Sequence, residues 1–160
     1  MKVLVFSDSH GETEYMMEAV RREKPYAVVH LGDHARDADK LDRAFPLMPL
    51  CRVKGNCDLG DLDNPTERMI QWGNCKIFAS HGHRYGVKGG AMNFYYAALE
   101  QGAQVALFGH THRACCEEIN GLWLLNPGAC GGRTPTYGII NIEEDSISCR
   151  VKDFVQEERV

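Results

Sequence analysis

The sequence lacks long apolar segments and paired cysteine spacings. No apolar run among its 160 residues approaches the roughly 18–20 residues that a membrane-spanning helix requires. The run at residues 1–6 is too short for the hydrophobic region of a signal peptide. The seven cysteines are odd in number and none has the Cys-x-x-Cys spacing of zinc or thiol-redox sites, which argues against a disulfide scaffold. We therefore expect a cytoplasmic protein without membrane association.

Positive charge is also scarce. Eighteen Lys and Arg oppose 22 Asp and Glu, which leaves a net charge of −4. A protein that binds nucleic acid over an extended surface needs a broad electropositive field, so we expect no such binding and only local basic contacts. With 44% hydrophobic residues, a chain of this length can bury most of its surface without cross-links. We expect residues 1–160 to form a single domain.

The apolar runs predict alternating strands and helices over the first two thirds of the chain. Strands are expected at 2–7, 26–31, 50–53, 67–72, 75–79 and 103–108, and helices at about 12–24, 36–45 and 90–101. Turn signals at 120–121, 126–128 and 144–145 then indicate antiparallel strands, and 156–160 should be a solvated, frayed end. The pattern predicts an α/β sandwich with mixed sheets inside and helices outside.

Five strand-to-loop junctions carry residues that can bind metal ions. They are Asp8 with His10, Asp33, Asn56, His81, and His110 with His112. Because functional sites of open α/β sheets gather at the carboxyl ends of strands, residues distant in sequence should converge there. The set as a whole therefore predicts one metal centre.

Each of these residues, taken alone, is weak evidence for a metal site. Asp8 alone would be read as a helix cap, and Gly32-Asp33 alone as a common turn. We interpret His30 and His34 as structural, hydrogen-bonded rings. In contrast, His110 and His112 are two residues apart, and in an extended segment their imidazoles would point the same way and serve two metals.

A mixture of imidazole, carboxylate and amide ligands suits Mn²⁺, Fe²⁺, Zn²⁺, Co²⁺ or Ni²⁺ better than it suits calcium. Two cations about 3.5–4 Å apart need a shared anionic ligand. Asp33 is the best candidate for that bridging carboxylate.

The ordered motifs resemble those of the calcineurin-like metallophosphoesterase superfamily, and in particular its small single-domain bacterial and archaeal phosphodiesterases. The motifs are Asp8-Ser9-His10, Gly32-Asp33, Gly55-Asn56-Cys57-Asp58, His81-Gly82-His83, Gly109-His110-Thr111-His112 and Asn126-Pro127-Gly128. The resemblance covers nearly the whole chain. It implies a four-layer fold in which two mixed β-sheets are flanked by α-helices.

The resemblance also implies a site with two divalent metal ions, Mn²⁺ foremost and Fe, Ni, Zn or Co as alternatives. One ion would be held by Asp8, His10, Asp33 and His112, and the other by Asp33, Asn56, His81 and His110. By the same resemblance, Asp33, Asn56 and His81 are catalytic. A hydroxide bridging both ions would attack the phosphorus of a small phosphodiester or nucleotide-like substrate, giving an alcohol and a phosphomonoester.

The sequence departs from this family at Cys57, where many members have a His that resembles a general acid. We interpret Cys57 as structural, although its thiol could be protonated at neutral pH. His83 and His34 lie beside ligand motifs without an assigned role. Arg84 and Arg133 could contact phosphate, but an exposed Arg is more often simply solvated.

Other functions remain open at this level. The resemblance extends to the retromer scaffold subunit, so a non-catalytic protein-interaction scaffold is the alternative, although a scaffold does not need all seven metal ligands. A structural metal site is a poorer match, because such sites are typically closed by four Cys or His ligands. The aromatic segment 93–96 would suit a homo-oligomer interface as well as the core or the cleft.

Overall fold

The computed structural model describes residues 1–154, so the end predicted to be frayed, 156–160, lies outside the described residues. The first sheet is formed by β1 (Lys2–Phe6), β2 (Ala27–His30), β3 (Leu50–Arg52), β9 (Thr136–Ile142) and β10 (Ile147–Asp153). The second is formed by β4 (Glu67–Trp72), β5 (Cys75–Ser80), β6 (Val105–Leu107), β7 (Cys115–Ile119) and β8 (Leu122–Asn126). The helices are α1 (Glu14–Glu23), α2 (Asp39–Ala44) and α3 (Met92–Glu100), with 3-10 turns η1 (Ala35–Ala38), η2 (His83–Tyr85) and η3 (Val87–Gly89).

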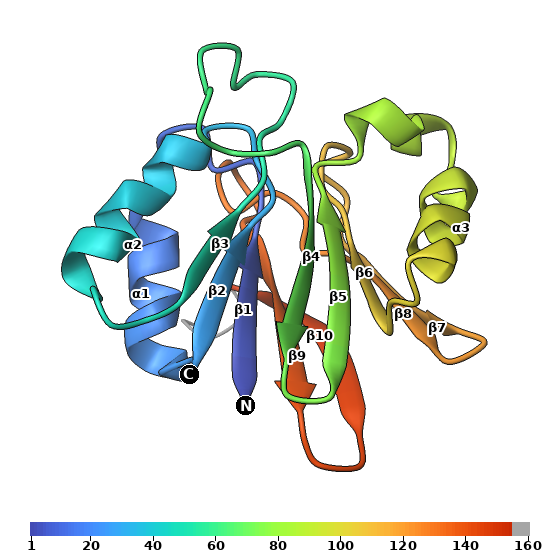
Figure 1. Ribbon diagram of the computed structural model, residues 1–160. Coiled ribbons are helices and arrows are strands. Elements are labelled where there is room, and N and C mark those ends of the chain that lie inside the picture. Colours follow the sequence, from blue (N-terminus) through green and yellow to red (C-terminus); the bar gives the residue numbers. More distant parts are fainter. Residues whose placement is uncertain (155–160) are drawn as a thin grey trace.

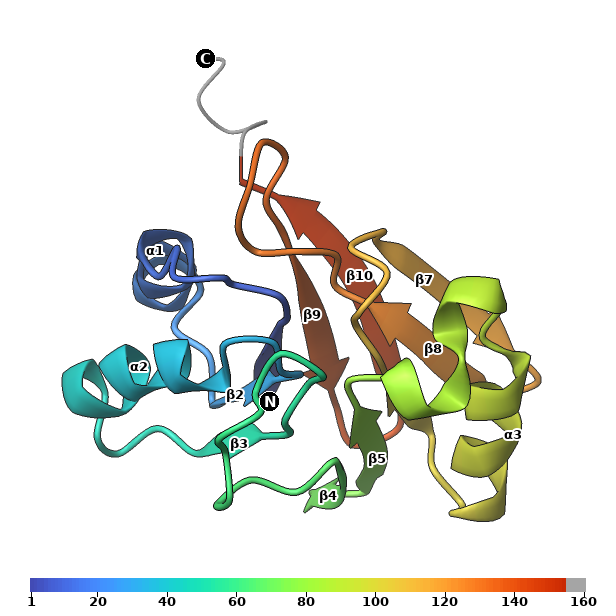
Figure 2. The same ribbon diagram turned by 90° about the horizontal axis from the view of Figure 1, so that it is seen from above.

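Both sheets are mixed. The first has the order β10-β9-β1-β2-β3 and the second β4-β5-β6-β8-β7. Strands β1, β2 and β3 are parallel, as are β5, β6 and β8, while the hairpins β4-β5, β7-β8 and β9-β10 add antiparallel pairs. The sheets face each other, with α1 and α2 outside the first and α3 outside the second (Figures 1 and 2). The predicted fold class is confirmed.

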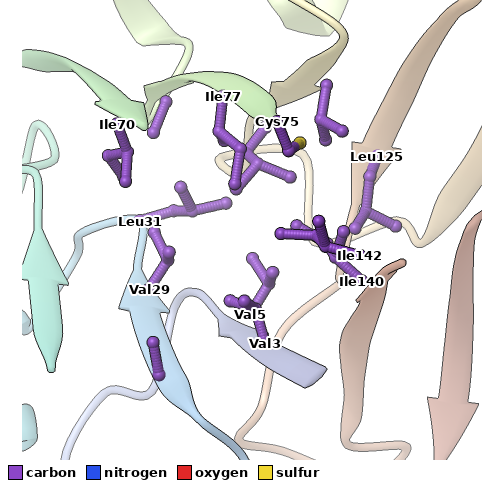
Figure 3. Packing of buried hydrophobic residues seen from close by; sticks show 14 of the residues in the cluster. Val3, Val5, Val29, Leu31, Ile70, Cys75, Ile77, Leu125, Ile140 and Ile142 are labelled. Atoms are coloured by element: carbon purple, nitrogen blue, oxygen red, sulfur yellow. The ribbon is translucent and has the colours of Figure 1, made fainter. Parts of the chain in front are cut away.

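The sequence of β1 explains why this strand lies in the middle of the layers. Val3 and Val5 point into the core between the two sheets, whereas Leu4 and Phe6 point into the core beneath α1 and α2. All four are completely buried, which is worth roughly 1.5–3 kcal/mol for each side chain. Figure 3 shows Val3 and Val5 in the core that also contains Ile77 of β5 and Leu125 of β8.

The spacing of apolar residues also explains helix α1. Its apolar residues recur on one face, where Met16, Ala19 and Val20 are buried against the first sheet. Glu14 in its first turn and two arginines in its last turn complement the helix dipole. The helix therefore covers the outer face of β1 and β2 through apolar packing.

One turn prediction was wrong. The signals at 120–121 and 144–145 do mark hairpins, but 126–128 does not join antiparallel neighbours. Strand β8 pairs in parallel with β6, and the chain then leaves the second sheet to form β9 in the first. A Pro-Gly turn signal locates a change of direction, but the sheet that the next strand joins is decided by burial. None of the helices within 1–154 has the length and apolar character needed to cross a membrane.

Candidate metal centre

The ligand candidates converge at one edge of the molecule. They follow the carboxyl ends of β1, β2, β3, β5 and β6, and Figure 1 shows the loops after β1, β2 and β5 together at its upper edge. Parallel strands within each sheet place these ends side by side, and the packing of the two sheets brings the two edges together. The predicted convergence is therefore present in the structure.

Six of the seven candidates form two clusters. Asp8, His10 and His112 make one group, and Asp33, His81 and His110 make the other; within each group the potential ligand atoms all lie within 4.8 Å of one another. His81 connects the groups, because its Nε2 lies 3.4 Å from Asp33 Oδ2 and 3.9 Å from Asp8 Oδ1. The two clusters are thus close enough to share a site.

The His81 ring is oriented by the backbone. Its Nδ1 donates a hydrogen bond to the Leu31 carbonyl oxygen at 2.9 Å, so in the neutral ring Nε2 carries the lone pair. That Nε2 is buried without a hydrogen-bond partner, and so is Asp8 Oδ1. Buried polar groups normally have partners, and a lone pair facing two carboxylates is repelled unless a cation lies between them. The donor set therefore fits a divalent ion.

The pKa shifts have the same origin. Burial by itself would raise the pKa of Asp33, but the His81 ring and the Cys57 backbone N–H outweigh it and hold that pKa well below its ordinary value. Burial would lower the pKa of His81, yet Asp33 and Asp8 together raise it. For His110, burial and then the neighbouring His81 lower the pKa. Burial thus acts on all three groups, and for Asp33 and His81 the contacts with their neighbours outweigh it.

Backbone strain is concentrated at the site. Eight residues other than glycine have a positive φ between residues 1 and 154, and five of them are ligand candidates. These are Asp8, His10, Asp33, His110 and His112, with φ from 46° to 68°. Left-handed conformations of such residues persist only where the surrounding structure imposes them, and they cluster at functional sites.

This geometry corrects the expectation for His110 and His112. The segment is not extended; it is a turn in which the Thr111 N–H donates to the Gly109 carbonyl oxygen at 2.8 Å. The two rings consequently enter different clusters instead of lying on one ledge. One histidine therefore lies in each cluster, and the turn is the cause of this division.

Two glycines allow the loops to approach this closely. A Cβ on Gly55 would lie 2.1 Å from Asp33 Oδ1 and 2.6 Å from the Asp33 nitrogen. A Cβ on Gly109 would lie 2.0 Å from Ser7 Oγ, the hydroxyl that donates to the Asp8 carboxylate. Glycine at these positions is needed because any side chain would displace a carboxylate of the site.

Sequence reasoning missed the positioning role of Asn126. This fully buried side chain donates from Nδ2 to the Gly109 carbonyl oxygen (3.1 Å) and to Thr111 Oγ1 (2.9 Å), and its Oδ1 accepts from the Gly128 N–H. It therefore holds the turn that carries both histidines. The sequence feature that could have indicated this role is a polar residue at the end of the apolar strand Leu122–Asn126.

The loop that carries Asn56 is linked to Asp33 by the next residue, Cys57. Cys57 donates from its backbone N–H to Asp33 Oδ1 at 2.9 Å, which fixes the loop, while the exposed Asn56 side chain donates to Cys57 Sγ at 3.6 Å. Partial desolvation and the Asp33 carboxylate raise the pKa of the Cys57 thiol. Cys57 is exposed, so it is not a buried apolar residue.

His30 is a buried structural residue, as expected. Its Nδ1 accepts from the Gly32 N–H and its Nε2 lies 3.0 Å from Ser9 Oγ, while burial lowers its pKa to about 4. His34, in contrast, is exposed beside His10, with 4.8 Å between ring centroids, so its interpretation as a structural, hydrogen-bonded ring was wrong. Neither belongs to a cluster.

The remaining residues singled out in the sequence lie around the site. The His83 ring is 5.5 Å from His81 and 6.1 Å from His110, with a buried Nδ1 that lacks a partner. The exposed Arg84 donates to Thr66 Oγ1, and Arg133 is exposed. None of the three is part of the clusters.

Two cavities lie beside the loops that carry the ligand candidates. The wide cavity, of about 590 Å³, is lined by Thr111, Arg113 and Lys88 among others. The narrow cavity, of about 240 Å³, is lined by His34, Cys57 and Asp58 among others. Each cavity is therefore lined by residues that adjoin ligand candidates in the chain, Thr111 in the wide cavity and His34 and Cys57 in the narrow one.

Comparison with known proteins agrees with this geometry. Residues 1–145 match the calcineurin-like phosphoesterase superfamily domain. The chain is 38% identical over 157 residues to the probable metallophosphoesterase YsnB of Bacillus subtilis, covering 96% of this chain and 91% of that protein. It is 26% identical to the phosphodiesterase YfcE of Escherichia coli, with 88% of each chain covered. The structure of Vps29 from Chaetomium thermophilum has a TM-score of 0.80 at 19% identity, over 96% and 87% of the two chains, a likeness of fold alone.

Proposed function

Because this chain belongs to the calcineurin-like phosphoesterase superfamily, we propose that it is a phosphodiesterase that works with two divalent metal ions, most readily Mn²⁺. The name of the relative YfcE supports diester substrates. The observation that carries the proposal is the pair of clusters joined by His81, in which Asp8 Oδ1 and His81 Nε2 are buried without hydrogen-bond partners. Such atoms are suited to metal ions.

The proposed ligands follow the two clusters. Asp8, His10 and His112 would hold one ion, and His81, His110 and Asn56 the other, with Asp33 shared between them as the bridging carboxylate. The shared role of Asp33 is supported by its position beside His81 and by its depressed pKa, since burial is outweighed by the His81 ring and the Cys57 N–H. Asn56 belongs to the set because its loop is hydrogen-bonded to Asp33 through the Cys57 N–H.

When bound, two such ions polarise phosphoryl oxygens and lower the pKa of a water molecule, so that it can attack phosphorus at neutral pH. The residues of the chain hold the proposed ligands in position. The Leu31 carbonyl keeps the His81 tautomer with Nε2 toward the carboxylates, and Asn126 keeps His110 and His112 in their separate clusters. We propose catalytic roles for Asp33, Asn56 and His81 on this basis.

The half-exposed His112, whose side chain is 52% exposed, and the wide cavity lined by its neighbours Thr111 and Arg113 leave room for a small phosphoester. A nucleotide-like diester is the proposed substrate class. A protein-interaction scaffold on the same fold remains the competing function, and the retained set of all seven ligand residues favours the enzyme. Cytoplasmic location, a homo-oligomeric state and the single-domain organisation stay predictions from the sequence.

The test is hydrolysis of bis(4-nitrophenyl) phosphate and 4-nitrophenyl phosphate by chelator-stripped protein before and after addition of Mn²⁺. We expect turnover only with metal, and faster turnover of the diester. Asp33→Asn should lower the rate by at least about a hundredfold, because removing a bridging anion disturbs both ions.

Asp63→Asn is the matched control, since Asp63 is exposed on the neighbouring loop and outside both clusters. It should turn over like the unmodified chain. Metal-loaded protein that hydrolyses neither compound would contradict the proposal and favour the scaffold.

A further inference from the structure

The wide cavity beside the His110–His112 turn carries two cationic side chains and no acidic one. Lys88 and Arg113 line it, and its other lining residues bear no charge. In a chain with a net charge of −4, this is a local concentration of positive charge. Within residues 1–154, neither side chain forms an ion pair. Both are therefore available to an anion.

The narrow cavity differs in charge. Its lining contains Arg36 but also Asp58 and Asp61. Asp58 is engaged with the backbone, because its carboxylate accepts hydrogen bonds from the N–H groups of Ala35 and Gly55. An anionic group beside the metal centre is thus favoured on the side of the wide cavity.

Arg113 is attached to the metal-binding turn. Its backbone N–H donates to Thr111 Oγ1 at 3.1 Å, and the same oxygen accepts from Asn126 Nδ2 at 2.9 Å. The start of the Arg113 side chain is therefore held at a defined place relative to His112, its neighbour in the chain.

Lys88 is linked, through its neighbour Val87, to the loop that follows His81. It lies in the turn η3 (Val87–Gly89), whose Val87 is 4% exposed and packs against Gly82, the residue after His81. A Cβ on Gly82 would lie 2.9 Å from Val87 Cγ2. Through Val87 and Gly82, the start of the Lys88 side chain is therefore held near the loop that follows His81.

The cavity is larger than a phosphate group requires. Its volume of about 590 Å³ lies within the range of roughly 300–1,000 Å³ that is usual for small-molecule sites. Its walls are formed partly by the apolar residues Val87, Ala91 and Phe108. An organic group such as a nucleoside can therefore occupy the space, with an anion at its end.

We propose that this cavity binds the part of the substrate beyond the scissile phosphate, and that Lys88 and Arg113 recognise a second, terminal phosphate on it. The inference rests on the proposed function and specifies its substrate class as phosphodiesters with a terminal phosphomonoester, such as short 5′-phosphorylated oligonucleotides. In the reaction, water adds to the diester phosphorus, one phosphorus–oxygen bond breaks, and the released alcohol takes up a proton. The terminal phosphate is bound and remains unchanged.

The test compares two dinucleotides that differ only in the terminal group, TpT and 5′-phosphorylated pTpT, with Mn²⁺-loaded protein. We expect kcat/KM to be roughly tenfold or more higher for pTpT, the usual effect of one charge-assisted contact. In Lys88→Gln/Arg113→Gln this ratio should fall to about one, because neither cation remains. Lys88→Arg should keep the preference.

Lys76→Gln is the matched control. Lys76 is an exposed residue near the start of β5, whereas His81 follows the end of that strand, so the ratio should not change. Equal rates for TpT and pTpT in the unmodified enzyme, or a preference that survives in the double variant, would overturn the inference. If bis(4-nitrophenyl) phosphate and both dinucleotides all remain intact, the proposed function itself fails, and the inference fails with it.

Discussion

His112 Nε2 lies 3.0 Å from Asp8 Oδ1, yet this carboxylate oxygen has no hydrogen-bond partner. The contact joins the loop after β1 to the loop after β6, and therefore one sheet to the other. Asp8 is 1% exposed, whereas the His112 side chain is 52% exposed. A buried carboxylate oxygen is thus paired with an accessible ring nitrogen, in an arrangement that a metal ion entering from solvent can complete.

The first prediction concerns this pair. His112→Asn should reduce the bound metal from two ions per chain to about one, since one cluster loses an imidazole while the other keeps all its ligands. The half-exposed position of His112 should leave the fold intact. The measurement is metal content after loading and desalting, together with the far-ultraviolet circular dichroism spectrum.

His34→Asn is the control, because this exposed histidine lies beside His10 but outside both clusters. It should retain two ions. A His112→Asn protein that also holds two ions would remove His112 from the ligand set.

The second prediction tests the close approach of two loops. Gly55→Ala should destabilise the protein by roughly 1–3 kcal/mol and lower its activity, because the new Cβ would lie 2.1 Å from Asp33 Oδ1 and 2.6 Å from the Asp33 nitrogen. Gly60→Ala, in the same loop with nothing within 4 Å of the new Cβ, should change neither property. Urea denaturation and diester hydrolysis would decide; equal behaviour of the two variants contradicts the argument.

The third prediction concerns pH. Glu23, at the end of α1, accepts hydrogen bonds from Lys2, Lys152 and Tyr137. Burial opposes ionisation, but these partners outweigh it and lower the pKa of Glu23 from 4.5 to about 2. Because the folded pKa is depressed, this stabilisation is complete above pH 4.5 and is lost as the pH falls toward 2.

Glu23→Gln should therefore cost about 1.5–3 kcal/mol at pH 7, the range for hydrogen bonds to a charged group. The difference from the unmodified chain should shrink between pH 4.5 and 2. Glu18→Gln, at an exposed position on the same helix, should have little effect at any pH. Denaturation curves at pH 7 and pH 3 provide the comparison, and a difference that does not depend on pH would exclude the ionic explanation.

The local sequence was sufficient for most of the fold. Each predicted strand and helix of the first two thirds is present within a few residues, because strands buried on both faces are nearly continuous apolar runs and α1 has a clear apolar face. Local sequence patterns could not predict which sheet the segment after Asn126 joins. Its Pro-Gly turn gives no information about which sheet can bury the apolar residues of β9.

The sequence by itself determined which side chains stand at strand ends and what chemistry they can offer. Asp8, Asp33 and His81 follow apolar strands, and the carboxyl ends of parallel strands meet at a common edge. Only the tertiary structure decided how the histidines divide between two clusters and which cations line the wide cavity. Those features depend on a turn with positive φ at His110 and on a cavity between Lys88 and Arg113. Both arise where two sheets and their loops pack together, through contacts between residues that local sequence patterns do not relate.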